Sequence, residues 1–92
     1  MRNERITLIS KKAAGAQVGE NSIEVFAEKK SVTRSEFYAA YSAGLNPKFM
    51  FNIDSMDYEA AEEPQMVLYN KKRYNIIRAY ETPENGVELT VG

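Results

Sequence analysis

Phe49-Met50-Phe51-Asn52-Ile53-Asp54 has the cleanest period-two alternation in this chain of 92 residues. Because successive side chains of a strand point to opposite faces of the sheet, the run predicts an extended strand, which we place at residues 48–58. Its two faces would carry Phe49, Phe51 and Ile53 on one side and Met50, Asn52 and Asp54 on the other. We expect the first face to be buried.

Two hairpins are indicated downstream. Residues 65–69 and 73–80 are predicted strands around Asn70-Lys71-Lys72, where Asn70 tolerates the left-handed backbone of a tight turn. Pro83-Glu84-Asn85-Gly86 contains an Asn-Gly pair, a strong hairpin signal. A final strand with strict alternation follows this pair, at Val87, Leu89 and Val91.

Two more strands are indicated upstream. Residues 4–12 alternate weakly and are predicted to be a strand, whereas the alanine- and glycine-rich residues 11–21 are expected to form a loop. Residues 22–32 form the next predicted strand. Its faces would carry Ile23, Val25 and Ala27 on one side and Glu24, Phe26 and Glu28 on the other.

The segment 33–47 has a different character from the strands around it. Thr33 and Glu36 have the spacing of a capping box, and Gly44 is suited to end a helix. The segment is too short to be a stable helix without packing, and Pro47 ends it, so it is interpreted as a loop with helical tendency. It has few aliphatic residues to anchor it, and we expect it to be among the least protected parts of the free chain.

Six strands with regular turn signals predict an all-β fold, a small six-stranded and mostly antiparallel β-barrel with a long loop between the second and third strands. Closure of a barrel removes the exposed sheet edges that a small all-β protein would otherwise present. The length and the 43% hydrophobic fraction fit a single domain over residues 1–92.

The composition narrows the possible chemistry. The chain has no cysteine and no histidine, which removes disulfides, thiol nucleophiles, imidazole bases and most zinc sites. Its net charge of −1 gives no global case for nucleic-acid or membrane-surface binding. No apolar run approaches the length of a spanning helix, and residues 1–5 do not resemble a signal peptide. We expect no enzyme activity, no cofactor and no metal.

An ordered set of short patterns carries a family resemblance. The set is Val32-Thr33-Arg34-Ser35-Glu36-Phe37-Tyr38-Ala39-Ala40, Ala43-Gly44-Leu45-Asn46-Pro47, Phe51-Asn52-Ile53, Asp57-Tyr58, Tyr69-Asn70-Lys71-Lys72-Arg73-Tyr74-Asn75-Ile76-Ile77-Arg78, Tyr80 and Val87-Glu88-Leu89. No single piece is specific, but their order and spacing over residues 5–89 resemble the phage head–tail connector, or head-closure, family of Gram-positive phages and prophages. One departure is Lys71, which replaces a glycine usual in that family's hairpin and puts the turn geometry in doubt.

The resemblance implies a structural virion protein. Its subunits would form a dodecameric ring that closes the DNA exit channel after packaging and provides the docking surface for the tail. The implied partners are the portal and adaptor ring, a tail terminator or tail-completion protein, copies of itself and transient DNA in the channel, with no membrane. Such connectors often stay monomeric until a template ring is presented. The implied location is the virion, and the host cytoplasm during assembly.

The resemblance also assigns the loop at residues 33–47 to the channel. The candidate interface and channel residues are Ser35, Glu36, Phe37, Tyr38, Tyr41 and Leu45. The alternative is that the aromatic residues only pack a short helix on the barrel mouth. The basic cluster Lys71, Lys72 and Arg73 is either a solvated turn or a contact with DNA phosphates or an acidic neighbouring subunit.

Two further sets of residues have competing interpretations. The acids Asp54, Asp57, Glu59, Glu62 and Glu63, which run into an acidic connector at residues 59–64, lack the spacing of a calcium loop and are interpreted as solvated charge. Tyr58, Tyr69, Tyr74 and Tyr80 are interpreted as packing residues. Their alternative, a stacking platform for single-stranded nucleic acid, gives the competing function of a small OB-like nucleic-acid-binding barrel.

Overall fold

Strand β3 (Phe49–Asp54) buries the face that its alternation predicts, and Met50 of the opposite face is buried as well. Phe51 and Ile53 are fully buried, and Phe49 packs against the same cluster. The structure is a computed structural model that describes residues 2–14 and 17–92, without the side chains of residues 12–18. Its other elements are β1 (Glu4–Ala14), β2 (Gln17–Lys30), α1 (Arg34–Ser42), α2 (Ser55–Ala60), β4 (Met66–Tyr69), β5 (Lys72–Thr82) and β6 (Gly86–Val91).

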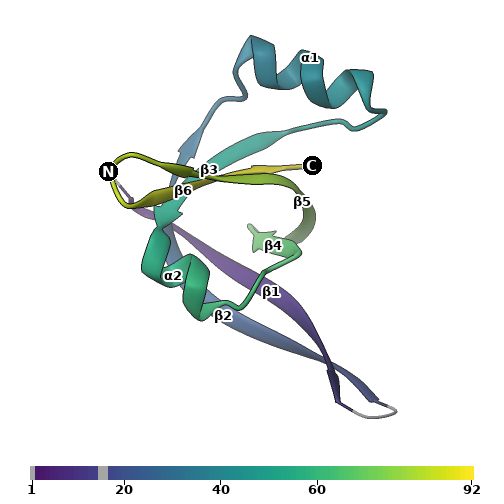
Figure 1. Ribbon diagram of the computed structural model, residues 1–92, viewed down its shortest axis with the longest axis vertical. Helices are drawn as coiled ribbons and strands as arrows, with labels where there is room; N and C mark the ends of the chain where they lie inside the picture. Colours follow the sequence, from purple (N-terminus) through teal and green to yellow (C-terminus); the bar gives the residue numbers. More distant parts are fainter. Residues whose placement is uncertain (1, 15–16) are drawn as a thin grey trace.

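The strands form the predicted all-β barrel. Their order is β1-β2-β3-β6-β5-β4, all neighbours are antiparallel, and β1 closes the barrel by pairing with β4. Figure 1 shows α2 at one end of β3 and α1 standing over the other. The core inside the barrel consists of Ile6, Leu8, Val25, Ala27, Phe51, Ile53, Ala61, Val67, Val87, Leu89 and Val91.

The segment 33–47, interpreted from the sequence as a loop with helical tendency, contains a helix with both ends capped. The Thr33 hydroxyl accepts a hydrogen bond from the Glu36 amide at 3.3 Å, which is half of the predicted capping box. At the other end Gly44 has a φ of 79°, and the amides of Gly44 and Leu45 bond the carbonyls of Tyr41 and Ala40. This Schellman pattern uses the glycine as the sequence predicted.

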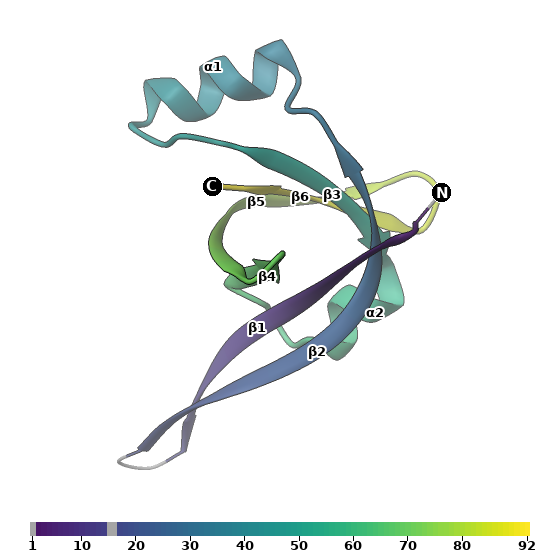
Figure 2. The same cartoon turned by 180° about the vertical axis from the view of Figure 1, so that it is seen from behind.

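Two elements differ from the sequence prediction. Residues 11–14 and 17–21 are not a loop, because β1 and β2 continue as a paired arm with Lys11 opposite Glu20 (Figure 2). Backbone pairing alone can extend a hairpin beyond the core, so no apolar alternation is required there. Residues 15 and 16 lie outside the described residues.

The second difference lies after β3. Residues 55–58 were predicted as strand but begin α2, because the Asp54 carboxylate accepts a hydrogen bond from the Met56 amide at 2.8 Å and caps a helix. The alternation of Phe49, Phe51 and Ile53 ends there. The Asp54 side chain then bonds the backbone of the following residues, which favours a helix start over a longer strand.

Both downstream turns are tight. Asn70 and Lys71 have φ values of 52° and 67°, as a type I′ turn requires, so Lys71 adopts the conformation that a glycine would adopt more easily. In the second hairpin Asn85 has a φ of 54°. A side chain at Gly86 would place its Cβ 2.8 Å from the Thr82 hydroxyl, so this position requires glycine.

Candidate functional site

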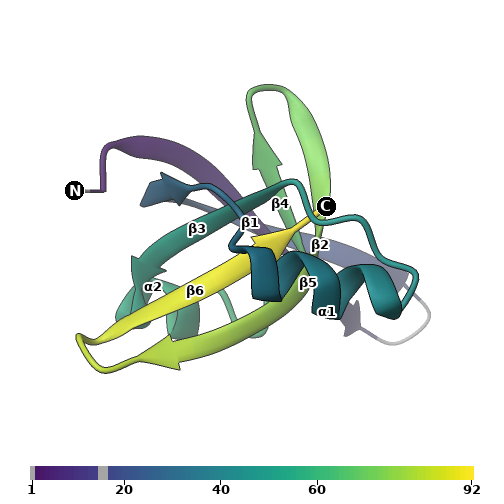
Figure 3. The same cartoon turned by 90° about the horizontal axis from the view of Figure 1, so that it is seen from above.

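Helix α1 lies over the outer face of β6 and β5. Met50 and Thr90 are opposite each other on β3 and β6 and are 2% and 0% exposed, although they point away from the barrel core. The Thr90 hydroxyl donates to the Glu36 carboxylate of α1 at 3.4 Å, and Ala40 on the same helix is buried. Figure 3 shows the helix crossing above β6 and β5.

Glu36 is the polar anchor of this helix. Arg78 on β5 donates through Nη1 to both carboxylate oxygens of Glu36, at 3.2 and 3.0 Å. The Glu36 side chain is only 12% exposed, so this ion pair is partly shielded from water. The reciprocal capping bond from Glu36 is replaced by these tertiary contacts. Leu45, a candidate interface residue at the end of this segment, is exposed.

The aromatic face of α1 consists of Phe37, Tyr38 and Tyr41, which are 38%, 61% and 67% exposed. The rings of Phe37 and Tyr41 are stacked with their centroids 5.9 Å apart, and Tyr38 meets Phe37 edge-on at 6.1 Å. Leu45 and Ser35 are also exposed. Of the predicted interface set, five side chains therefore face solvent, and Glu36 alone turns inward.

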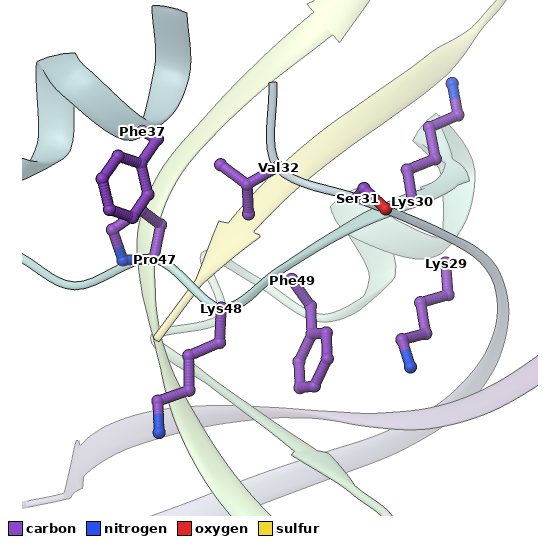
Figure 4. A pocket seen from close by; sticks show the side chains of 8 residues that line it. All are labelled: Lys29, Lys30, Ser31, Val32, Phe37, Pro47, Lys48 and Phe49. Atoms are coloured by element: carbon purple, nitrogen blue, oxygen red, sulfur yellow. The ribbon is translucent and has the colours of Figure 1, made fainter. Parts of the chain in front are cut away.

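A lysine groove lies between the end of β2, the start of α1 and the start of β3. Its volume is about 480 Å³, and its lining is Lys29, Lys30, Ser31, Val32, Phe37, Pro47, Lys48 and Phe49 (Figure 4). In Figure 4 the ammonium group of Lys29 points toward the Phe49 ring, whereas the Lys48 side chain extends away from that ring on its other side. The Lys29 Nζ lies 4.4 Å from the ring centroid of Phe49 and 5.4 Å from that of Tyr69, in cation–π geometry.

The sequence patterns did not single out this groove. Lys48 follows Lys30 by 18 positions in the chain, and the two meet because β2 pairs with β3, with Lys30 opposite Met50 and Lys29 opposite Phe51. Antiparallel pairing of the two predicted strands would have been the one available signal. Within the described ranges 2–14 and 17–92, no carboxylate pairs with Lys29, Lys30 or Lys48.

The predicted basic cluster is divided by the fold. Arg73 donates to the Glu20 carboxylate of β2 at 3.1 and 3.2 Å, so its positive charge is directed to the arm of its own chain. The hydrogen bond and charge of Arg73 lower the pKa of the Glu20 carboxyl and, reciprocally, raise the pKa of Arg73. Lys71 and Lys72 are exposed at the hairpin turn.

The acidic residues lie on and around α2. Asp54 caps the helix and lies 3.9 Å from Arg2, whereas Glu59 and Glu63 are exposed. No three acidic side chains in the described part of the chain converge as metal ligands would. Met56 is 76% exposed at the same end of the barrel.

Three of the four predicted packing tyrosines contact the core. Tyr58, Tyr69 and Tyr74 pack against it, and the Tyr69 ring lies 5.2 Å from Phe51 between centroids. The Tyr69 hydroxyl donates to Glu4 at 3.5 Å. Tyr80 alone is largely exposed. The rings of Tyr58, Tyr69 and Tyr74 are therefore engaged in packing and do not form an open stacking surface.

Neither a protein-family model nor a curated protein matches this sequence. In the part of the chain that the structure describes, neither helix has the length and apolar character needed to cross a bilayer.

Proposed function

We propose that this protein is a structural virion subunit that forms a ring at the head–tail interface of a tailed phage or prophage. There it would close the DNA exit channel after packaging and offer the tail its docking surface. The observation that carries the proposal is the solvent-exposed aromatic face of α1, inserted between β2 and β3 of a closed barrel. The ordered sequence resemblance supports the same role.

The closed barrel supports association through side chains. Within the barrel every strand has two neighbours and free strand edge remains mainly in the β1–β2 arm, so partners of the barrel itself meet its loops, helices and outer faces. Helix α1 is the largest such projection with exposed rings. Tyr and Phe provide large contact areas at a small loss of side-chain freedom, which suits subunit interfaces.

A role by packing rather than catalysis fits the chemistry of the chain. Histidine and cysteine are absent from the sequence. The groups that α1 presents are two phenols, one phenyl ring and a leucine, which are suited to burial and not to proton transfer. Burial of these rings against neighbouring copies would narrow a central channel.

The lysine groove is the observation that favours a second function, a nucleic-acid-binding barrel. Its lysines could meet phosphates, and Phe37 and Phe49 could meet bases. Lys29 already lies over the Phe49 ring at 4.4 Å, however, which leaves that face unavailable for stacking. We therefore prefer the connector.

The decisive experiment is to locate the protein in particles. Cryo-electron microscopy of virions from a strain that carries this gene should show a ring of barrels between the portal and the tail, and deletion should yield heads that lose DNA. Intact, infectious particles without the protein would refute the connector role. Retention of single-stranded DNA by the free protein at physiological salt would instead support the nucleic-acid function.

A further inference from the structure

The two ends of β3 carry opposite charge. Lys48 immediately precedes the strand and lies in the lysine groove with Lys29 and Lys30. Asp54 ends the strand and begins α2, whose surroundings carry the exposed carboxylates Glu59, Glu62 and Glu63. The six residues of β3 separate these surfaces by about 17 Å. The net charge of −1 does not reveal that the basic and acidic side chains gather at opposite ends of β3.

Helix α2 projects from the barrel as an acidic knob. None of its six residues is fully buried, and it is held to the barrel by Tyr58, which packs against the core, and by Ala61, which is 1% exposed. Met56 is the most exposed large apolar side chain of those described, at 76%. A flexible thioether side chain next to carboxylates suits a contact with a groove that is both apolar and basic.

The lysine groove has the complementary properties. Val32, Phe37 and Pro47 give it an apolar lining, and Lys30 and Lys48 are exposed at its sides without a carboxylate partner in the described residues. Unpaired ammonium groups beside apolar surface would gain from a partner that brings both acids and an apolar side chain. The α2 knob of another copy has both.

We infer that α2 of one subunit docks in the lysine groove of the next, with Met56 against the apolar lining and Glu59 and Glu63 facing Lys30 and Lys48. The occupant is a second copy of this chain. Because the knob and the groove lie at opposite ends of β3, α2 cannot reach the groove of its own molecule. The contact between two copies is therefore head-to-tail. Repeated head-to-tail contacts generate a closed ring when the rotation closes. This inference deepens the proposed function and rests on it.

The lining by Phe37 connects this contact to the aromatic face. Phe37 is part of the groove and also stacks on Tyr41 at 5.9 Å. A neighbour seated in the groove would therefore bury one edge of the aromatic face and order the rest. Assembly and narrowing of the channel would then be coupled through one side chain.

Charge reversal provides the first test. Lys30→Glu/Lys48→Glu gives a chain that is acidic at both ends, and Glu59→Lys/Glu63→Lys gives one that is basic at both ends. Sedimentation velocity at high concentration and low salt should show wild-type self-association, weakened about tenfold or more in each variant. An equal mixture of the two variants should associate again, as alternating copies. The matched control, Lys71→Glu/Lys72→Glu, should behave as wild type.

A cross-link provides the second test, because the chain has no cysteine of its own. In the double variant Met56→Cys/Ser31→Cys, a short bismaleimide should join position 56 of one copy to position 31 of the next and produce a ladder of oligomers. Met56→Cys with Glu24→Cys, five residues before Lys29 on β2, should give no ladder. Circular dichroism of each variant checks that the barrel is folded.

The outcomes separate this inference from the proposed function. The knob-and-groove contact would be overturned if no ladder formed. It would also be overturned if each charge-reversal variant self-associated as strongly as the wild-type protein. A ring at the virion neck together with no ladder would leave the connector role intact and place the contact elsewhere. A ladder from a protein that is missing from virions would support the knob-and-groove contact and refute the connector role. Binding of single-stranded DNA that Lys30→Glu/Lys48→Glu abolishes, without any ladder, would assign the groove to nucleic acid.

Discussion

At the scale of single residues, two positions show how the barrel is stabilised. Phe51 is 0% exposed and contacts the rings of Phe49 and Tyr69, at centroid distances of 6.2 and 5.2 Å. Lys71, in contrast, costs stability, because it has a left-handed backbone conformation that is unfavourable for a residue with a Cβ. Phe51 therefore stabilises the barrel through burial, whereas the strained backbone of Lys71 is what allows a two-residue turn between β4 and β5.

Phe51→Ala should lower the free energy of unfolding by about 3–5 kcal/mol, because it removes a buried ring and leaves a cavity. That is a large share of the stability of a small domain. Urea denaturation measures the change. Phe26→Ala, which removes a ring that is 53% exposed on β2, should lose under about 1 kcal/mol. Equal losses would show that the inner face of β3 is not the core.

Lys71→Gly should raise the free energy of unfolding by up to about 1 kcal/mol. Glycine relieves the left-handed strain of roughly 1–2 kcal/mol, and its larger freedom in the unfolded chain offsets part of that gain. Lys72→Gly, one residue later in β5, should instead lower stability by about 0.5–1 kcal/mol relative to Lys72→Ala. Chemical denaturation midpoints test both. A loss in both variants would argue against the type I′ turn.

At the scale of elements, α1 depends on its tertiary anchors. A helix of nine residues is marginal in isolation, so its caps, the burial of Ala40 and the ion pair of Glu36 with Arg78 must stabilise it. The strands rely on pairing around the whole barrel. We therefore still expect α1 to exchange amide protons faster than the barrel does.

Glu36→Ala should loosen α1 without unfolding the barrel. It removes both bonds from Arg78 and leaves the Thr90 hydroxyl, in a residue that is 0% exposed, without its acceptor. Hydrogen exchange over residues 34–42 should become about tenfold faster, equivalent to about 1.4 kcal/mol. Ser35→Ala, on the solvent side of the same helix, is the control. Identical exchange in the two variants would mean that Glu36 does not anchor the helix.

At the scale of the whole molecule, three surface features lie outside the barrel core. The aromatic face, the lysine groove and the acidic knob are all exposed on a chain whose barrel is already closed. Large exposed rings on a small domain indicate a partner surface. In the proposed ring, these features become contacts between subunits and with the channel.

The triple variant Phe37→Ala/Tyr38→Ala/Tyr41→Ala should still fold as a barrel, because the three rings lie outside the core. In phage it should yield heads that leak DNA or fail to join tails, since the rings would no longer pack across the channel. Phe26→Ala is the matched control and should give normal particles. Full infectivity of the triple variant with DNA retained would leave α1 as a passive cover.

The local patterns were sufficient for most of the barrel. Period-two alternation around Phe51 and Leu89 predicted the buried faces, and the Asn-containing turns predicted the later hairpins, because burial and turn geometry act over a few neighbouring residues. The caps of α1 at Thr33 and Gly44 were also readable. Each of these features depends on residues close together in the chain.

Only the tertiary structure decided which distant side chains meet. The pairing of β2 with β3 brought Lys29 to Lys48, and the position of α1 brought Glu36 to Arg78 and Thr90. The start of α2 at Asp54 was likewise hidden by the strand pattern before it. These outcomes depend on strand register and barrel closure, which are set by the summed packing of the whole core and not by any local run of residues.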